Sequence, residues 1–271
     1  MKAAGKKKHA PLKLYGQEQE GGTWAMANMN MIIHDMEGEI QIGDTFRKPK
    51  FRRGNRLQTF DRAVANPMWN QTEFKEKDYD ADELDRFPKG AGFPGGKADW
   101  GWVLDTGAAS RGSGNANTNK EKDVRRWFVE QDLIEGVIYL PENLFYNTTA
   151  PGIILVLNRA KPKERKEKLF LLNANREFTK GDPKNYIAED AIFRIADTFN
   201  EWKEVEKYSR IVSREEIAKN DFNISPSRYI HTGEADEYRP IAEIVEELEA
   251  VEEEAKETDA VLKGILAKLN A

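Results

Sequence analysis

The sequence contains no cysteine, and its 271 residues include only three histidines. Without cysteine there are no disulfide bonds and no thiolate ligands for a metal ion. The histidines, His9, His34 and His231, are far apart and lack the spacing of metal ligands, so we predict no metal site. No apolar run is long enough to span a bilayer, and no signal peptide is recognisable. A cytoplasmic protein without a membrane partner is therefore expected.

The charge is distributed unevenly along the chain. Hydrophobic residues make up 39% and charged residues 33%, with a formal net charge of -5, a composition that suits one large α/β domain with an appendage. Between Glu234 and Asp259, twelve acidic residues accompany two basic ones. Such an acidic stretch repels phosphates, which argues against the C-terminus as a nucleic-acid contact. We expect a domain at residues 1–233 and a separate helix at residues 234–271.

The C-terminal helix is expected to carry one apolar seam. From Ile241 to Leu269 the apolar positions alternate spacings of three and four, the heptad pattern of a coiled coil. The helix would be roughly 43 Å long. One apolar stripe cannot be buried by the helix alone, so the seam packs either on its own domain or on a partner helix. The acidic outer face favours the partner.

Strand-like and helix-like patterns alternate through the rest of the chain. The predicted strands cover residues 12–18, 39–46, 58–66, 102–108, 133–140, 151–158 and 168–174, and the predicted helices cover residues 23–34 and 121–131. In the first helix, Thr23 is the expected N-cap. The expected buried faces are Trp24, Ala27, Met31 and His34 in the first helix, and Val124, Trp127 and Phe128 in the second. We read residues 72–101 as a loop. The alternation predicts a mostly parallel sheet covered on both faces.

Three polar residues follow successive predicted strands: Glu18, Asp44 and Asn66. Ligands of open α/β sheets bind outside the carboxyl ends of the strands, so these side chains are candidates for one site. An acid at such a strand end accepts hydrogen bonds from ribose hydroxyls in nucleotide-binding folds. An acid after the next strand can accept from the exocyclic amine of adenine, because a carboxylate is acceptor-only.

The run Asn66-Pro67-Met68-Trp69 is suited to activating an adenine amine. The Asn66 side-chain carbonyl and the Pro67 backbone carbonyl offer two acceptors, and proline restricts both its own backbone and that of Asn66. Such acceptors stabilise the positive charge that grows on the attacking nitrogen. Stacking of an extruded base on Trp69 is worth about 1–3 kcal/mol. The alternative is that Asn-Pro forms a turn and Trp69 lies in the core.

Together these stretches resemble the modification (M) subunit of type I restriction–modification systems, which are S-adenosylmethionine-dependent DNA adenine-N6 methyltransferases. In chain order the resemblance rests on YGQE, TWAMANMNMIIH, GDTF, FDRAVANPMWNQ, ADWGW, VLDTGAASRGSG, RRWFVEQDLIEGVIYLPENLFYNTTAPGIILVLN and NDFNISPSRYI. It covers nearly the whole chain and is specific from Leu14 onward. It implies a Rossmann-like methyltransferase sheet followed by a long C-terminal helix.

The resemblance also implies roles for single residues. Glu18 would bind the ribose of S-adenosylmethionine and Asp44 its adenine amine, with Phe46 in the same cofactor site. Asn66, Pro67, Met68 and Trp69 would form the catalytic Asn-Pro-Pro-aromatic motif, with Met68 in place of the commoner proline. Phe145 or Tyr146 would hold the flipped base from the other side. The implied partners are DNA, the specificity (S) subunit, bound through the C-terminal helix, and the restriction (R) subunit.

The sequence departs from the family at the cofactor loop. A glycine-rich loop and a first strand precede "LYGQE" in the family, but only thirteen residues precede Leu14 here and they contain neither. A helix and the start of a strand are also absent between Trp102 and Val103. We expect a truncated sheet that binds S-adenosylmethionine weakly or not at all and is weak or inactive as an enzyme alone. One alternative is an inactive fragment that serves as an interaction module for the specificity subunit. Another is methylation of protein glutamine, which uses a similar motif.

Overall fold

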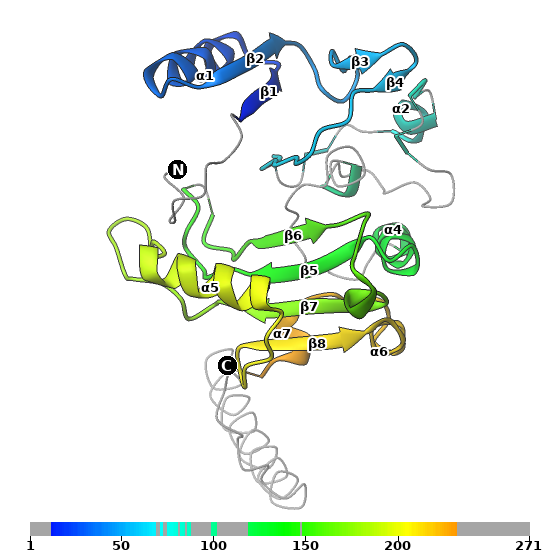
Figure 1. The fold of residues 1–271 in the computed structure, drawn as a ribbon, viewed down its shortest axis with the longest axis vertical. Coiled ribbons are helices and arrows are strands. Elements are labelled where there is room, and N and C mark those ends of the chain that lie inside the picture. The colour runs from blue at the N-terminus through cyan, green and yellow to red at the C-terminus, as the bar shows by residue number, and fades with distance from the viewer. Residues whose placement is uncertain are drawn as a thin grey trace, which may run out of the picture. The chain divides into compact units, whose positions relative to one another are not determined.

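The computed structural model describes residues 12–68, 71–72, 75–80, 82–84, 86–87, 99–101, 119–146 and 148–231 (Figure 1). The chain divides into two units, residues 1–231 and residues 232–271, and every described residue belongs to the first. The predicted strand at residues 102–108 and the predicted C-terminal helix with its heptad seam lie outside the described residues. Within the described part, no helix is both long enough and apolar enough to cross a membrane.

The N-terminal elements form a β-α-β unit. Strands β1 (Lys13–Glu18) and β2 (Glu37–Ile42) pair in parallel, from Lys13 opposite Glu37 to Glu18 opposite Ile42. Helix α1 (Gly21–Ile33) connects them. The parallel pairing requires a crossover connection, and α1 supplies it. The two predicted strands and the predicted helix are confirmed to within a few residues at each end.

Helix α1 differs from its prediction at both ends. Its N-cap is Glu20, not Thr23, because the Glu20 carboxylate reaches forward past two glycines to accept a hydrogen bond from the Thr23 N–H at 2.6 Å. Trp24, Ala27 and Met31 are half-buried, and the Trp24 indole donates to the Ile40 carbonyl oxygen at 2.7 Å. His34, predicted to lie on the buried face, is exposed because the helix ends just before it.

The predicted strand at residues 58–66 does not form. Strands β3 (Arg52–Arg53) and β4 (Arg56–Leu57) make a short antiparallel hairpin, and the following residues 58–68 have no regular secondary structure. Val64, the largest apolar side chain of its Ala-Val-Ala run, is 97% exposed. A short apolar run becomes a strand only where a neighbouring strand and a covering layer receive it. The predicted loop at 72–101 contains the short helix α2 (Glu76–Asp80).

The second sheet has the strand order β6-β5-β7-β8. It comprises β5 (Ile134–Tyr139), β6 (Ile153–Leu157), β7 (Lys168–Asn173) and β8 (Ser209–Ser213). Only β5 and β7 pair in parallel, and the two outer pairs are antiparallel. The expectation of a mostly parallel sheet is therefore wrong for this part of the chain. β6 returns antiparallel because the segment that follows β5 contains no crossover helix.

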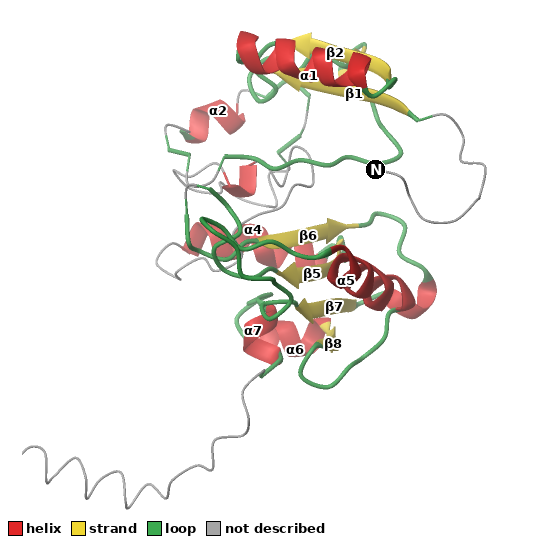
Figure 2. Ribbon diagram, turned by 90° about the vertical axis from the view of Figure 1, so that its left-hand side faces the viewer, coloured by secondary structure: helices red, strands yellow, loops and turns green. Residues whose placement is uncertain are grey.

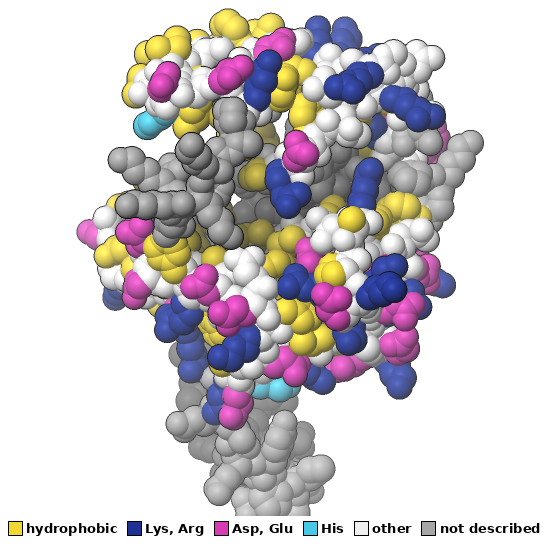
Figure 3. All heavy atoms as spheres, in the orientation of Figure 1, with side chains coloured by type: hydrophobic (Ala, Val, Ile, Leu, Met, Phe, Trp, Pro, Cys, Tyr) yellow, Lys and Arg dark blue, Asp and Glu magenta, His cyan; other side chains and the backbone are white. Residues whose placement is uncertain are grey.

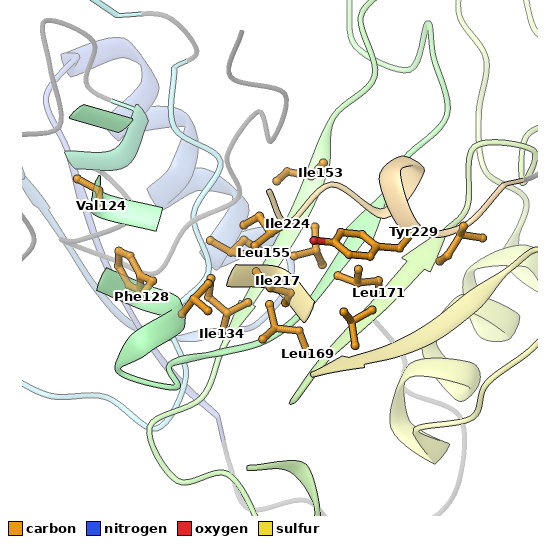
Figure 4. Close-up of a cluster of buried hydrophobic side chains, with 14 of the residues drawn as sticks. Val124, Phe128, Ile134, Ile153, Leu155, Leu169, Leu171, Ile217, Ile224 and Tyr229 are labelled. Atoms are coloured by element: carbon orange, nitrogen blue, oxygen red, sulfur yellow. The ribbon is translucent and has the colours of Figure 1, made fainter. Parts of the chain in front are cut away.

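Helices cover both faces of this second sheet (Figures 1 and 2). One face packs against α4 (Asn119–Glu130), α6 (Arg214–Lys219) and α7 (Pro226–Tyr229), and the other packs against α5 (Glu189–Glu201). Figure 4 shows the first core, which includes Val124, Phe128, Ile134, Ile153, Leu155, Leu169, Leu171, Ile217, Ile224 and Tyr229. The predicted face of the second helix is confirmed, with Val124 and Phe128 buried and Trp127 packed beside them.

Successive residues of the central strands point to opposite cores. In β7, Leu169 and Leu171 belong to the cluster against α4, α6 and α7, whereas Phe170 and Leu172 belong to the cluster that includes Ile195 of α5. This alternation follows from the two-residue period of a strand. Because both faces are buried, β5 and β7 read as nearly continuous apolar runs, which is why sequence patterns located them.

Candidate functional site

The carboxyl ends of β1 and β2 bring Glu18 and Asp44 to the same end of the N-terminal sheet. Glu18 lies opposite Ile42 in the parallel register. The Gly43 N–H then donates to the Glu18 carbonyl oxygen at 2.8 Å, and Asp44 follows. Gly43 has a φ of +149°, which favours glycine at this turn. The arrangement at the sheet end agrees with the sequence prediction, while the binding roles of both acids stay predictions.

Two carboxylates fix the turn between β1 and α1. Glu18 Oε1 accepts a hydrogen bond from the Glu20 N–H at 2.8 Å, and Glu20 in turn caps α1. The N–H groups of Thr23 and Gly22 and the Thr23 hydroxyl hold the pKa of Glu20 below its ordinary value. A carboxylate has about four acceptor positions, so Glu18 keeps acceptor capacity beyond the bond to Glu20. The side chain is thus oriented by its own backbone and can still accept from a ligand.

Asp44 organises the turn after β2. Its Oδ1 accepts from the Phe46 N–H at 2.8 Å and from the Arg47 N–H at 2.9 Å, the pattern of an Asx turn. Its Oδ2 lies 3.3 Å from Arg47 Nη1, and the Arg47 side chain is half exposed. Asp44 therefore has a structural function as well as a candidate binding function. Oδ2 is the oxygen with more capacity for an external donor.

Phe46 lies in an aromatic core. Only 2% of the residue is exposed. Its ring lies 5.4 Å from the ring of Tyr79 and 5.0 Å from that of Phe87, measured between centroids. Arg86 forms an ion pair with Asp82 at 2.7 Å and donates to the Phe46 carbonyl oxygen at 2.5 Å. The side chain predicted to line the cofactor site thus anchors the turn that holds Asp44.

This anchor was not found from the sequence. Tyr79, Asp82 and Arg86 all fall in the segment that the sequence reading treated as a loop. Burial raises the pKa of Tyr79, as expected for a phenol packed among aromatic rings. The only available signal was the Asp-x-x-x-Arg spacing of Asp82 and Arg86, which is too common to indicate an ion pair by itself.

A second aromatic cluster joins the Asn-Pro segment to β1. The Phe60 ring lies 5.2 Å from the Tyr15 ring, and the Tyr15 ring lies 5.5 Å from that of Phe51. Asn66, six residues after Phe60, is exposed. Pro67 is half-buried, Met68 is 70% exposed, and Trp69 lies outside the described residues. Phe60 therefore fixes the start of the segment on the strand that ends at Glu18.

Phe145 and Tyr146 lie in the connection between β5 and β6. Phe145 is half-buried and Tyr146 is 84% exposed. Lys184 holds this connection, because its Nζ donates to Asn143 Oδ1 at 2.8 Å and to the Thr148 carbonyl oxygen at 3.1 Å. These two acceptors flank the aromatic pair in sequence. Tyr146 is thus exposed to solvent on a loop that Lys184 holds at a residue before it and a residue after it.

Asn185 adds backbone contacts to the same loop. Its N–H donates to the Asn143 carbonyl oxygen at 3.0 Å, and its Nδ2 donates to the Glu142 carbonyl oxygen at 3.1 Å. Neither Lys184 nor Asn185 was among the predicted site residues. A lysine and an asparagine in a polar stretch carry no signal of a contact forty residues away. Within the described ranges, no group of three or more His, Asp or Glu side chains is placed to bind a metal ion.

The described site thus consists of a β-α-β unit with acids at its strand ends and an Asn-Pro segment whose start contacts the first strand. The sequence signature of the N-6 DNA methylase family matches residues 1–238, and the chain belongs to that family. Its fold is an α/β fold like that of type I restriction–modification methyltransferases. The resemblance inferred from the sequence motifs is thereby confirmed.

Individual relatives show how much of such a subunit the chain represents. It is 38% identical over 282 residues to the type I restriction enzyme MjaVIII methylase subunit of Methanocaldococcus jannaschii, a match covering 95% of this chain and 48% of that one. The HindI methylase subunit of Haemophilus influenzae is 30% identical over 277 residues, covering 95% and 61%. The chain spans about half the length of the M. jannaschii relative.

A solved structure also matches this chain over about half of its own length. The type I restriction–modification methyltransferase subunit from Streptococcus thermophilus superposes with a TM-score of 0.72 at 25% identity. That superposition covers 81% of this chain and 48% of the other. The shared part therefore includes most of the elements described above, and about half of the solved subunit has no counterpart in this chain.

Proposed function

We propose that this chain is the part of a type I modification subunit that holds the adenine to be methylated at N6, with S-adenosylmethionine as methyl donor. The observation that carries the proposal is the meeting of Glu18 and Asp44 at the end of a parallel β-α-β unit in a member of the N-6 DNA methylase family. Acids at that position are where nucleotide ribose and base edges are recognised in open α/β sheets.

The two acids fit the nucleoside portion of the donor. Glu18 is oriented by the Glu20 N–H and keeps acceptor positions for ribose hydroxyls. Asp44 is oriented by two backbone N–H groups on Oδ1, and Oδ2, which accepts from Arg47 at 3.3 Å, has further capacity to accept from an exocyclic amine. Phe46 acts here as a positioning residue, because its buried ring fixes the backbone that Asp44 caps. S-adenosylmethionine supplies the methyl group when bound.

Asn66 and Pro67 are the proposed acceptors for the adenine amine. The Asn66 side chain is exposed, so it is accessible to a base extruded from DNA. Two fixed carbonyl oxygens draw the amine hydrogens away from the ring plane and stabilise the positive charge on nitrogen during transfer. Met68 and Trp69 complete the motif, with Trp69 assigned to stacking. Phe145 or Tyr146 is assigned the second contact with the base, on the loop that Lys184 closes.

The wider assembly follows from the same assignment. DNA is the substrate, the specificity subunit is the proposed partner of the helix at residues 234–271, and the restriction subunit completes the complex. A second candidate function is an interaction module without catalysis. The half-length match and the 97% exposure of Val64 beside the Asn-Pro segment favour it. Co-purification with the specificity subunit, before and after removal of residues from Glu234 onward, tests the helix assignment in either case.

Calorimetric titration with S-adenosylmethionine tests the cofactor assignment. The full chain is titrated alone and together with the part of the MjaVIII methylase subunit that lies outside its match to this chain. We expect weak binding or none by the chain alone and micromolar binding by the mixture. Asp44→Ala should abolish that binding, and Asp61→Ala, an exposed acid of the same region, should leave it unchanged. Equal binding by both variants would refute the role of Asp44.

Methylation of DNA tests the motif. The same mixture, supplied with the specificity subunit, should produce N6-methyladenine detectable by mass spectrometry of the digested DNA. Asn66→Ala should lower the rate at least about 100-fold, the usual effect of removing a preorganised polar group that stabilises transition-state charge. Asn55→Ala, in the turn between β3 and β4, is the matched control. Methylation of a glutamine peptide with no methylation of DNA would instead favour the protein-glutamine alternative.

A further inference from the structure

The segment that follows Asp44 is strongly basic. Residues 45–60 contain six Lys or Arg residues and no acid, although the chain as a whole has a net charge of -5. All six are exposed: Arg47, Lys48, Lys50, Arg52, Arg53 and Arg56. Figure 3 shows Lys and Arg side chains gathered around β3 and β4, apart from the exposed apolar side chains over α1, which include Met26, Met29 and Ile33. A positive patch of this density on an acidic chain indicates a polyanionic ligand.

The β3–β4 hairpin places two arginines opposite each other. Arg53 pairs with Arg56 across the two strands, and the turn between them begins with Gly54, whose φ is +61°. Residues directly opposite on neighbouring strands have Cβ atoms about 4.5–5.5 Å apart, and like charges in such a pair are destabilising. An anion bound between the two guanidinium groups would remove that repulsion. The pairing therefore weakens the hairpin itself and strengthens its attraction for an anion.

The acids of the described chain leave most of these cations without a partner. Arg47 pairs with Asp44 at 3.3 Å. Within the described ranges, the other five form no ion pair: Lys48, Lys50, Arg52, Arg53 and Arg56. Exposed arginines elsewhere do have acidic partners, as Arg126 of α4 has Glu130 at 2.7 Å. The charge of the hairpin is thus available to an anion from outside the chain.

The hairpin is held at its base by β1. Gln17 donates from Nε2 to the Lys48 carbonyl oxygen at 3.0 Å, and its Oε1 accepts from the Lys50 N–H at 2.8 Å. The Gln58 N–H donates to the Phe51 carbonyl oxygen at 3.0 Å, which closes the hairpin. The backbone that carries the cations is therefore ordered before any ligand arrives, and less conformational entropy is lost on binding.

The same part of β1 also anchors the Asn-Pro segment. The rings of Phe51 and Phe60 both contact Tyr15 and lie 6.1 Å apart between centroids. Gly54 follows Phe51 by three residues, and Asn66 follows Phe60 by six. At no more than about 3.6 Å per residue, the hairpin turn and Asn66 lie within roughly 45 Å of each other. One turn of duplex DNA is about 34–36 Å long, so both can contact the same short duplex.

We infer that the β3–β4 hairpin is a contact site for the phosphate backbone of duplex DNA, beside the adenine that Asn66 is proposed to receive. Arg53 and Arg56 would hold phosphate oxygens through their N–H forks, and Lys48 and Lys50 would add point charges. Such contacts position the duplex without reading its sequence. The location beside the target base rests on the proposed function, whereas the binding of DNA by the hairpin does not.

An acidic polypeptide is the other class of ligand that arginine forks can bind. DNA is favoured because the chain belongs to the N-6 DNA methylase family and because the hairpin shares its anchor with the Asn-Pro segment. Duplex DNA also carries one negative charge per about 1.7 Å of its axis, a density that suits cations crowded on one short hairpin.

Fluorescence anisotropy with labelled duplexes tests the inference. The full chain is titrated, without S-adenosylmethionine, into two duplexes of unrelated sequence. We expect a Kd of roughly 1–100 μM at physiological salt, equal for both duplexes, and a slope of log K against log salt of about -4. A Kd weaker than about 1 mM, or an affinity independent of salt, would overturn the inference.

Charge-removing substitutions locate the contact. The double variant Arg53→Gln with Arg56→Gln should fold as before by circular dichroism, bind about tenfold more weakly, and lower the magnitude of the salt slope by about two. Lys163→Gln with Lys166→Gln, at exposed positions between β6 and β7, is the charge-matched control and should leave binding unchanged. Asn55→Ala keeps every cation of the hairpin and should also bind as before. Equal weakening by the control pair would overturn the inference.

Two further measurements identify what the hairpin recognises. Arg53→Lys with Arg56→Lys keeps both charges and should keep the salt slope, and loss of the slope in that variant would overturn the inference. Unlabelled poly-glutamate of equal charge should displace the labelled duplex about tenfold less effectively than unlabelled duplex does. Equal or better displacement by poly-glutamate would overturn the assignment to DNA.

Steady-state methylation separates this inference from the proposed activity. Removal of both arginines should raise KM for DNA and leave kcat unchanged, because a backbone contact is made equally in the ground state and the transition state. Asn66→Ala should instead lower kcat. Hairpin-dependent DNA binding with no methylation would reject the activity and keep the contact site. Methylation with an unchanged KM in the arginine variant would reject the contact site and keep the activity.

Discussion

Lys184 Nζ donates a hydrogen bond to Asn143 Oδ1 at 2.8 Å, across 41 residues of sequence. The same amine donates to the Thr148 carbonyl oxygen at 3.1 Å. These bonds join the segment before α5 to the connection between β5 and β6. The exposed Tyr146 lies between the two acceptors, so an aromatic side chain offered to solvent is held on a closed loop.

Replacement of Lys184 by methionine should loosen this loop without unfolding the sheet. Hydrogen bonds from a charged donor contribute roughly 1.5–3 kcal/mol each, less for a partly exposed group. We expect amide exchange in residues 142–149 to become about tenfold faster, with the melting temperature nearly unchanged. Lys180→Met, at an exposed position of the same segment, is the control. Unchanged exchange in the loop would show that Lys184 does not hold it.

Gly136 of β5 lies opposite Phe170 of β7, with no room for a side chain. A Cβ atom there would lie 2.5 Å from the Phe170 carbonyl oxygen and 2.7 Å from Phe199 Cε2. The strands cannot separate without breaking the ladder, so Gly136→Ala should destabilise the protein by about 1–3 kcal/mol. Chemical denaturation followed by circular dichroism measures the change. Gly16→Ala in β1 is the matched strand variant, since its Cβ would meet only Ile40 side-chain atoms at 3.7 Å.

Phe46→Ala should be among the more damaging substitutions in the N-terminal part. Removal of this buried phenylalanine leaves a cavity beside Tyr79 and Phe87. Such a cavity typically lowers the free energy of unfolding by roughly 3–5 kcal/mol. Phe178→Ala, at a 45% exposed position, should change stability by less than about 0.5 kcal/mol. Denaturation of the two variants side by side checks the contrast. Comparable stability of both would mean that Phe46 is not a core residue in solution.

Glu20 predicts a pH dependence at the start of α1. Its pKa in the folded protein lies below the ordinary value of 4.5, because the Thr23 and Gly22 N–H groups donate to the ionised carboxylate. A lowered pKa means that the cap stabilises the folded state above pH 4.5 and is lost as the pH falls through the folded-state pKa. The Thr23 amide proton shift should titrate with a midpoint below 4.5, and Glu20→Gln should remove that titration. A midpoint at or above 4.5 would contradict the cap.

The second sheet was predicted best where burial dictates the sequence. β5 and β7 are largely buried on both faces and β6 on one, so each is a short, mostly apolar run with clear ends. Their mutual direction was not predictable from those runs, because pairing depends on connections and on neighbours distant in sequence. At residues 58–66 a strand was predicted that does not form. The local pattern is strand-like, but no described strand pairs with it.

The candidate site was predictable only in part for the same reason. Glu18 and Asp44 follow strand ends, and strand ends can be read locally. The burial of Phe46 depends on Tyr79 and Phe87, more than thirty residues away, in a stretch without periodicity. Lys184 depends on a loop forty residues earlier. Contacts between two segments without regular secondary structure produce no periodic sequence pattern in either segment, so they could not be predicted.

The exposed face of α1 has a consequence for synthesis on the ribosome. The β-α-β unit is complete at Ile42, whereas the second sheet is complete only when β8 ends at Ser213. At 5–20 residues per second, translation of the intervening chain takes roughly ten to thirty seconds. During that interval the nascent polypeptide already displays Met26, Met29 and Ile33 to solvent, as the finished structure does. The yield of soluble protein should therefore depend on chaperone supply.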